Sequence, residues 1–298
     1  MAKATPVLSK RQEPLSSKIF SVFNTTFLVL IALICLVPFI NIIASSLATT
    51  EEIVSKPFVI IPETFSLDAY RYILSTPTIF NSLWVTIFVT VAGTITSMIL
   101  TAMMAYGLSR KYLPGRRMMN FLVVFTMLFS GGMIPTFLVV NSLGLIDSLW
   151  SMILPIAVNA FNMIIMRNFF QGLPMSLEES AKMDGASDFL IFRKIMLPLA
   201  MPSVATISLF YAVAYWNTYM NAILYINDSA KWPIQILLRQ IVIVSSGMQG
   251  EGVAVDVIPP AQSIKMAVIV VATVPMLLVY PFVQKYFVKG ALVGSVKG

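Results

Sequence analysis

The amino-acid sequence predicts an all-α membrane protein with six transmembrane helices and both termini in the cytoplasm. Three observations support this fold class. Hydrophobic residues make up 58% of the 298 residues and charged residues only 11%, whereas a soluble domain is about 25% charged. Six long apolar runs separate the charged residues. Most Lys and Arg residues lie in segments that the runs would place on one side of a membrane, as the positive-inside rule expects of membrane proteins.

The residue types exclude several functions. Histidine is absent, which rules out Ser-His-Asp and Cys-His catalysis and imidazole–metal sites. The single cysteine, Cys35, lies in the first apolar run, so it can form neither an internal disulfide nor a cysteine-rich metal cluster. The net charge of +7 comes from basic residues beside the apolar runs. This placement favours a membrane surface over nucleic acid as the partner.

The stretches that contain no Asp, Glu, Lys or Arg are each long enough for the roughly 20 residues with which a helix crosses hydrocarbon. They predict spans at 20–46, 82–108, 118–141, 149–167, 199–225 and 265–286. The first span has a basic flank, and Ala44-Ser45-Ser46 resembles a signal-peptide cleavage site. Its apolar run is longer than the roughly 7–15-residue core of a signal peptide. We therefore interpret it as a retained helix.

The distribution of basic residues sets the orientation. Of the 20 Lys and Arg residues, all lie on one side of the predicted membrane except Lys56, Arg71, Lys231, Arg239 and Lys265. The predicted organisation is therefore a cytoplasmic tail at 1–19, a six-helix transmembrane domain at 20–286 and a cytoplasmic tail at 287–298. Within the domain, 168–198 is a cytoplasmic loop and 226–264 an external loop with an amphipathic stretch.

The cytoplasmic loop is longer than a simple connection requires, and its residues are patterned. Ser176 and Glu179 fit a capping box, in which each side chain bonds a backbone N–H of the first helical turn. The predicted helix runs over 177–184, and Gly185 suits the left-handed position that ends a helix. We expect the capping box at the start and a sharp turn at the glycine.

Ser187 or Asp188 can cap a second helix, which ends at Leu197-Pro198. The loop would then hold a short rigid helix at the membrane surface, joined by a turn to a helix that leads into the next span. Such a helix could insert into a socket on a cytoplasmic partner, or it could only close the helix bundle. The residues alone leave both readings open.

The same residues carry a family resemblance. Glu179-Ser180-Ala181, Gly185, Ile195 and Leu197-Pro198 follow the spacing of the EAA motif of ABC importer permeases, which reads E-A-A-x3-G-x9-I-x-L-P. Ser180 is the one departure, and it replaces a small residue by another small residue. The chain therefore resembles the type I ABC importer permeases.

The resemblance extends over nearly the whole chain. The six spans, the cytoplasmic termini and the closing segment 284–290 resemble the carbohydrate-importer permeases of the maltose-transporter (MalG-like) class. Phe129-Ser130-Gly131-Gly132-Met133-Ile134-Pro135 and Tyr215-Trp216-Asn217 resemble the LplC/YtcP-like branch, which is linked to complex oligosaccharides.

The family resemblance implies a permease subunit that spans the bacterial plasma membrane several times. Its implied partners are a second, non-identical permease subunit, two ATPase subunits, an external solute-binding protein and a carbohydrate substrate. ATP and Mg would be bound by the ATPase subunits and no cofactor by this chain, which contains no G-x-x-x-x-G-K-[ST] phosphate loop. The residues expected to couple to an ATPase are Glu178, Glu179, Ser180, Ala181, Asp184, Gly185, Ile195, Leu197 and Pro198.

Polar and aromatic residues inside predicted spans are candidates for a sugar pathway, because polar groups in lipid usually face a neighbour or a water-filled cavity. Aromatic faces and Asn amides match the C–H faces and hydroxyls of sugars. The same residue types also join helices to one another, so packing is the alternative reading. The candidates are Asn159, Asn162, Tyr211, Tyr215, Trp216, Asn217 and Tyr219. Tyr211, Tyr215 and Tyr219 follow one another at i, i+4 spacing and are expected to form one stripe on a helix.

Gly131, Gly132 and Pro135 lie inside the third apolar run. Two glycines and a proline loosen or kink a helix, so we expect a bend that serves either gating or close packing.

The sequence thus predicts a permease subunit, without an ATP site of its own, of an ATP-driven importer of carbohydrate, in particular oligosaccharide. The alternative is a self-contained secondary transporter or channel. That class is expected to hold ionisable residues within the membrane, and none lies deep in any predicted span.

Overall fold

A computed structural model describes residues 15–56, 58–245 and 262–295 of the chain. Over these residues the fold is helical, and three helices are long and apolar enough to cross a membrane alone. They are α1 (Leu15–Ser46), α4 (Pro77–Ser109) and α14 (Gln262–Ser295). They match the predicted first, second and sixth spans. Three bent helix pairs bring the total to as many as six when each pair counts as one span.

The third predicted span, 118–141, is broken rather than continuous. α5 (Arg116–Leu128) and α6 (Met133–Ser142) meet at an angle of 116°. Gly132 separates them with φ +86° and ψ 175°, a conformation that only glycine adopts readily. The expected bend at Gly131, Gly132 and Pro135 is confirmed, and it is sharp enough to make this segment two helices.

The fourth and fifth predicted spans also contain breaks. The fourth begins with two short 3-10 helices, η1 (Leu149–Met152) and η2 (Leu154–Ile156), and continues at 54° as α7 (Ala160–Gly172). The prediction of one helix over 199–225 is wrong. α11 (Met201–Trp216) ends before Asn217, and α12 (Met220–Tyr225) begins after a separate turn.

Short helices occupy the predicted external segments. α2 (Thr50–Ser55) and α3 (Asp68–Ser75) follow the first span, and η4 (Ser229–Lys231) and α13 (Ile234–Ser245) follow α12. The expected amphipathic stretch is therefore a helix, and its inward residues Ile234 and Ile236 are buried. The rest of the predicted external loop, over 246–261, lies outside the described residues.

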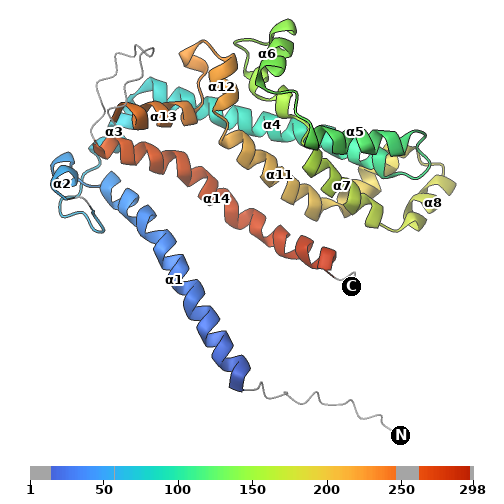
Figure 1. The fold of residues 1–298 in the computed structure, drawn as a ribbon, viewed down its shortest axis with the longest axis horizontal. Coiled ribbons are helices and arrows are strands. Elements are labelled where there is room, and N and C mark those ends of the chain that lie inside the picture. The colour runs from blue at the N-terminus through green and yellow to red at the C-terminus, as the bar shows by residue number, and fades with distance from the viewer. Residues whose placement is uncertain (1–14, 57, 246–261, 296–298) are drawn as a thin grey trace.

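Figure 1 shows how the long helices lie. α4, α11 and α14 run along the length of the molecule, and α1 meets α14 near α2 and α3 and then diverges from it. Most of α1 is exposed, including Cys35. α14 continues as helix to Ser295, through most of the predicted tail at 287–298. The predicted N-terminal tail, 1–19, lies mostly outside the described residues.

The core is centred on the contact between α4 and α11. Tyr211 and Tyr215 of α11 are 2% and 0% exposed, and their hydroxyls meet hydroxyls of α4. The distance between Tyr215 Oη and Ser97 Oγ is 2.7 Å, and that between Tyr211 Oη and Thr101 Oγ1 is also 2.7 Å. The two tyrosines therefore join the helices through both packing and hydrogen bonds.

Gly93 of α4 lies directly beneath the ring of Tyr215. A Cβ added at Gly93 would lie 2.8 Å from carbon atoms of that ring. We expect Gly93→Ala to lower the free energy of unfolding, because overpacking a close contact costs about 1–3 kcal/mol. Thermal unfolding of the purified chain in detergent measures this loss.

Gly107→Ala is the matched control. Gly107 lies in the same helix, and an added Cβ there meets nothing within 4 Å. Both variants gain the same helix propensity, about 1 kcal/mol, so their difference isolates the contact with Tyr215. Equal melting temperatures for the two variants would contradict the packing shown here.

Candidate functional site

The sequence directed attention to the loop between α7 and α11, and the structure forms a compact helical hairpin there. The first helix is α8 (Met175–Met183). The predicted capping box is wrong, because α8 begins directly after Pro174 and has no side-chain cap. Pro174 precedes the helix with φ −59°, close to the value that the proline ring fixes, and it has no N–H that needs a hydrogen-bond acceptor. Ser176 consequently lies inside the first turn instead of capping it.

The end of α8 follows the prediction. Gly185 has φ +80°. Its N–H donates to the carbonyl of Lys182 at 3.0 Å, and the N–H of Ala186 donates to the carbonyl of Ala181 at 2.9 Å. These two bonds form a Schellman motif, in which a left-handed residue closes the last helical turn.

The second helix of the hairpin begins at the predicted cap. The Oγ of Ser187 accepts from the N–H of Leu190 at 3.3 Å. The helical backbone then runs through α9 (Asp188–Ile191), the π-helical segment η3 (Phe192–Met196) and α10 (Leu197–Leu199). It meets α11 at 82°. One helical segment, Asp188–Leu199, therefore connects the turn after α8 to α11.

The two faces of α8 differ in their exposure to solvent. Glu178 and Ala181 face inward and are 4% and 9% exposed. The outward residues include Leu177, which is 40% exposed, and Met183, which is 89% exposed. Most of the predicted coupling residues are also exposed: Glu179, Ser180, Asp184, Gly185 and Pro198. Ile195 and Leu197 are half-buried.

Glu178 is the anchor of α8. Its carboxylate accepts a hydrogen bond from the guanidinium of Arg110, the residue that follows the last turn of α4. Tyr112 donates to the same carboxylate at 3.3 Å, and the ammonium of Lys182 lies 3.3 Å away. Glu178 therefore holds α8 against the end of α4. Its neighbour Glu179 is exposed and faces outward.

Lys182 and Asp188 extend this network to the second helix of the hairpin. Their Nζ and Oδ1 atoms are 3.1 Å apart, and the ammonium lies 4.2 Å from the centre of the Tyr112 ring. Desolvation lowers the pKa of Lys182, but its interactions with Asp188, Tyr112 and Glu178 outweigh that effect and raise the pKa above its ordinary value. The lysine thus stays charged at neutral pH and holds α8 against α9.

Most of the predicted sugar-pathway residues are in the core. Tyr211, Tyr215 and Trp216 are buried, and Asn162 is 6% exposed. Tyr215 Oη also donates to the carbonyl of Ile153 at 3.2 Å, and Trp216 Nε1 donates to the carbonyl of Ala272 at 3.0 Å. These aromatic residues hold α11 against its neighbours.

The remaining pathway candidates are exposed. They are Asn159, Asn217 and Tyr219. Asn159 caps α7, with its Oδ1 accepting from Asn162 N–H at 3.1 Å, and its own N–H donates to Tyr211 Oη at 2.9 Å. The expected stripe does not extend to Tyr219, because α11 has ended before that residue. The guanidinium of Arg239 instead lies 5.1 Å from the centre of the Tyr219 ring.

Sequence reasoning missed several residues of the hairpin site. Arg110, Tyr112 and Asp188 complete the network around Glu178, and Met183 is its most exposed apolar side chain. Arg110 lies just after a predicted span and Asp188 is a candidate helix cap, but nothing in the sequence pairs either residue with Glu178. Among the described residues, no group of three or more Asp, Glu, Cys or His side chains is placed to hold a metal ion.

Comparison with known proteins gives the geometry its context. Residues 97–292 match the family model described as the binding-protein-dependent transport system inner membrane component. The polygalacturonan/rhamnogalacturonan transport system permease protein YtcP of Bacillus subtilis (strain 168) is 67% identical over 286 residues, which cover 95% of this chain and all of that protein. Protein LplC of the same strain is 53% identical over 284 residues, covering 95% of this chain and 96% of LplC.

A solved structure is also similar. It is a chain in the crystal structure of a bacterial ABC transporter involved in the import of the acidic polysaccharide alginate. The two chains are 35% identical, with a TM-score of 0.83, and the match covers 93% of this chain and all of the other. At this similarity the two chains share the same overall fold.

Proposed function

The chain belongs to the family of binding-protein-dependent transport system inner membrane components, and from this premise we propose that it forms half of the pathway of an ATP-driven oligosaccharide importer. It is a multi-pass ABC importer permease of the bacterial membrane with the type I fold. The observation that carries the proposal is the 67% identity with a polysaccharide transport permease along nearly the whole of both chains. The proposed domain limits are 20–286 for the permease and 1–19 and 287–298 for the cytoplasmic tails.

The proposed substrate is an oligosaccharide that contains acidic sugars. Relatives named for polygalacturonan and for the acidic polysaccharide alginate support this class. A uronic acid combines an apolar ring face, hydroxyls and a carboxylate. The pairing of Tyr219 with Arg239 offers an aromatic face beside a cation, and Asn159 and Asn217 offer exposed amides. We propose these four residues as pathway contacts in place of the buried tyrosines.

The proposed coupling element is the outward face of α8. ABC importer permeases in general work with an ATPase and a binding protein. We propose that two ATPase subunits bind ATP and Mg, that one of them receives Leu177, Glu179, Ser180 and Met183, and that this chain hydrolyses no ATP itself. Support comes from the rigid capping of α8 and from its direct connection, through α9, η3 and α10, to α11.

The companions of the chain test this proposal. Affinity purification from gently solubilised native membranes, followed by mass spectrometry, is expected to recover a second permease, an ATPase and an external sugar-binding protein. Untagged membranes provide the control. The recovered binding protein can then be titrated with galacturonan and neutral oligosaccharides, and tighter binding of the former is expected.

Two results would contradict the proposal. Recovery of the chain alone, from membranes in which it supports uptake, would favour the self-contained transporter or channel. Preference of the co-purified binding protein for neutral oligosaccharides would leave the importer intact and reject the acidic substrate.

A further inference from the structure

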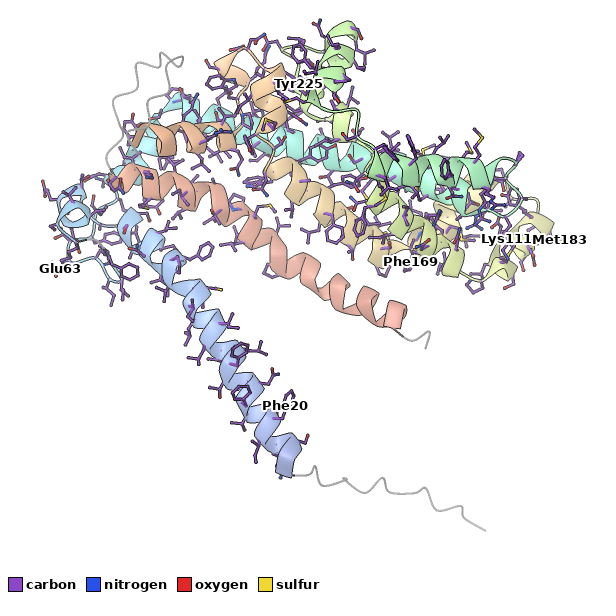
Figure 2. The ribbon with its side chains drawn as sticks, viewed as in Figure 1. Phe20, Glu63, Lys111, Phe169, Met183 and Tyr225 are labelled. Carbon is purple, nitrogen blue, oxygen red and sulfur yellow. The ribbon has the colours of Figure 1, made fainter. Side chains whose placement is uncertain are left out.

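A basic pocket lies beside the α8 hairpin, and none of the residues proposed for coupling lines it. It has a volume of about 590 Å³ and lies between the loop after α4, the start of α5 and the end of α7. Figure 2 shows Lys111, which lines it, at the same end of the molecule as Met183. The lining residues are Lys111, Leu113, Gly115, Arg116, Arg117, Asn120, Arg167 and Gln171. Four of them are cations and none is acidic.

Two arginines of the pocket are held in place by the chain. Arg116 Nε donates to the carbonyl of Leu108 at 3.0 Å. Arg167 donates from one terminal nitrogen to Asn120 and from the other to Asn168, the latter at 3.0 Å. The Nε of Arg167 is buried and has no hydrogen-bond acceptor among the residues that the structure describes. A buried donor without an acceptor is costly, so the site lacks an acceptor group.

The backbone adds to the positive potential. Arg116 is the first residue of α5, a 13-residue helix, and Gly115 precedes it at the N-cap position without a side-chain cap. The N-terminus of a helix carries a partial positive charge and unpaired N–H groups. Glu178 lines a smaller neighbouring pocket, but its charge is already paired with Arg110 and Lys182. The pocket is therefore suited to an anion that the described part of the chain does not supply.

The surroundings identify the kind of anion. The pocket lies at the predicted cytoplasmic surface of the membrane, where anionic phospholipids bind basic pockets between helices. α5 begins at the pocket, and its later residues are mostly apolar. Phe121, Leu122 and Leu128 of this helix are 65%, 48% and 75% exposed in this chain. A soluble anion would use only the cations, whereas a phospholipid would also cover these side chains with its acyl chains.

We propose that this pocket binds the phosphodiester headgroup of an anionic phospholipid, with the acyl chains along α5. The proposal depends on the location of the chain in a membrane and not on the substrate that it carries. A bound lipid would brace α5 against α7 and the loop after α4, directly beside the anchor of α8. The lipid is then a structural ligand of the cytoplasmic end of the permease.

Native mass spectrometry of the full-length chain with its companion subunits tests the proposal. The titrants are phosphatidylglycerol and phosphatidylcholine, which differ in headgroup charge. We expect phosphatidylglycerol to bind more tightly and Lys111→Gln/Arg117→Gln to weaken its binding about 25-fold, since each cation near the headgroup contributes a factor of about five. Both residues are exposed, so the double variant should fold.

Arg193→Gln/Lys194→Gln is the control, because it removes two exposed cations from the same predicted side of the membrane outside the pocket. Its affinity for phosphatidylglycerol should not change. Equal affinities for the two lipids, or equal losses in the two double variants, would overturn the proposal. Displacement of the lipid by glycerol 1-phosphate would assign the pocket to a soluble phosphate. Binding that is seen only after the companion subunits are removed would assign it to a protein contact.

Discussion

Gly185→Arg is expected to abolish oligosaccharide uptake while the chain remains in the membrane. Gly185 has φ +80° and closes the Schellman motif at the end of α8. Any residue with a Cβ costs about 1–2 kcal/mol in this conformation. That strain is too small to unfold the permease, but the arginine also places a long cation at the tip of the helix that is proposed to enter the ATPase. Uptake of labelled oligogalacturonide and the amount of chain in membranes measure the two effects separately.

A substitution series separates backbone strain from obstruction of the partner. A Cβ added at Gly185 meets nothing within 4 Å in this chain, so Gly185→Ala introduces strain without a clash. Gly185→Asn introduces less strain, because Asn tolerates the left-handed region. We expect Asn and Ala to retain most of the uptake and Arg to retain none. Normal uptake by the arginine variant would reject the coupling role of α8, and equal loss in all three would attribute coupling to the turn alone.

The positions of the spans could be read from the sequence because charge is excluded from hydrocarbon. The breaks inside the spans could be predicted only where glycine or proline marks them in the sequence. Gly131, Gly132 and Pro135 are such a signal, and the 116° bend lies there. The end of α11 at Trp216 has no glycine or proline beside it. No Asp, Glu, Lys or Arg lies between Lys194 and Asp228, so the uncharged run alone predicts one helix.

The sequence predicts correctly that the tyrosines of α11 share a face, but their role in a sugar pathway stays a prediction. Tyr211 and Tyr215 do share a face, as their spacing predicts. That face packs on Gly93, Ser97 and Thr101 of α4, which are themselves spaced four residues apart. The complementary stripe of small and hydroxyl residues was present in the sequence, but the pairing of two helices that are more than 100 residues apart depends on tertiary packing.

The register of α8 shows the same limit at the level of one residue. The sequence predicts the helix, its glycine turn and a following cap at Ser187 or Asp188, all of which depend on neighbours in the chain; the structure places the cap at Ser187. It does not distinguish Glu178 from Glu179, which differ by about 100° around the helix. The distinction comes from Arg110, which lies at the end of another helix and selects Glu178.

Glu178→Gln is expected to detach α8 from the rest of the permease and to abolish coupled uptake. The side chains of Arg110 and Glu178 are 8% and 6% exposed. Removing one partner of a buried pair leaves the other charge without compensation and costs about 3–5 kcal/mol. Since α8 has few other inward contacts, chiefly Ala181, the loss should appear as local opening. Hydrogen exchange over 175–185 in the purified complex measures it.

Two further variants test whether α8 opens because the buried Arg110–Glu178 pair is lost or because any charge near Glu178 is removed. Lys182→Gln removes a half-exposed partner of the same carboxylate and should cost no more than about 1 kcal/mol. Arg110→Met/Glu178→Met replaces the pair by apolar side chains and should restore protection of α8, because neither charge is then left buried alone. If Glu178→Gln and Lys182→Gln open α8 equally, the anchor is not the buried pair. If the double methionine variant restores protection and uptake together, Glu178 acts by positioning α8, and direct contact with the ATPase is left to the outward residues such as Glu179 and Met183.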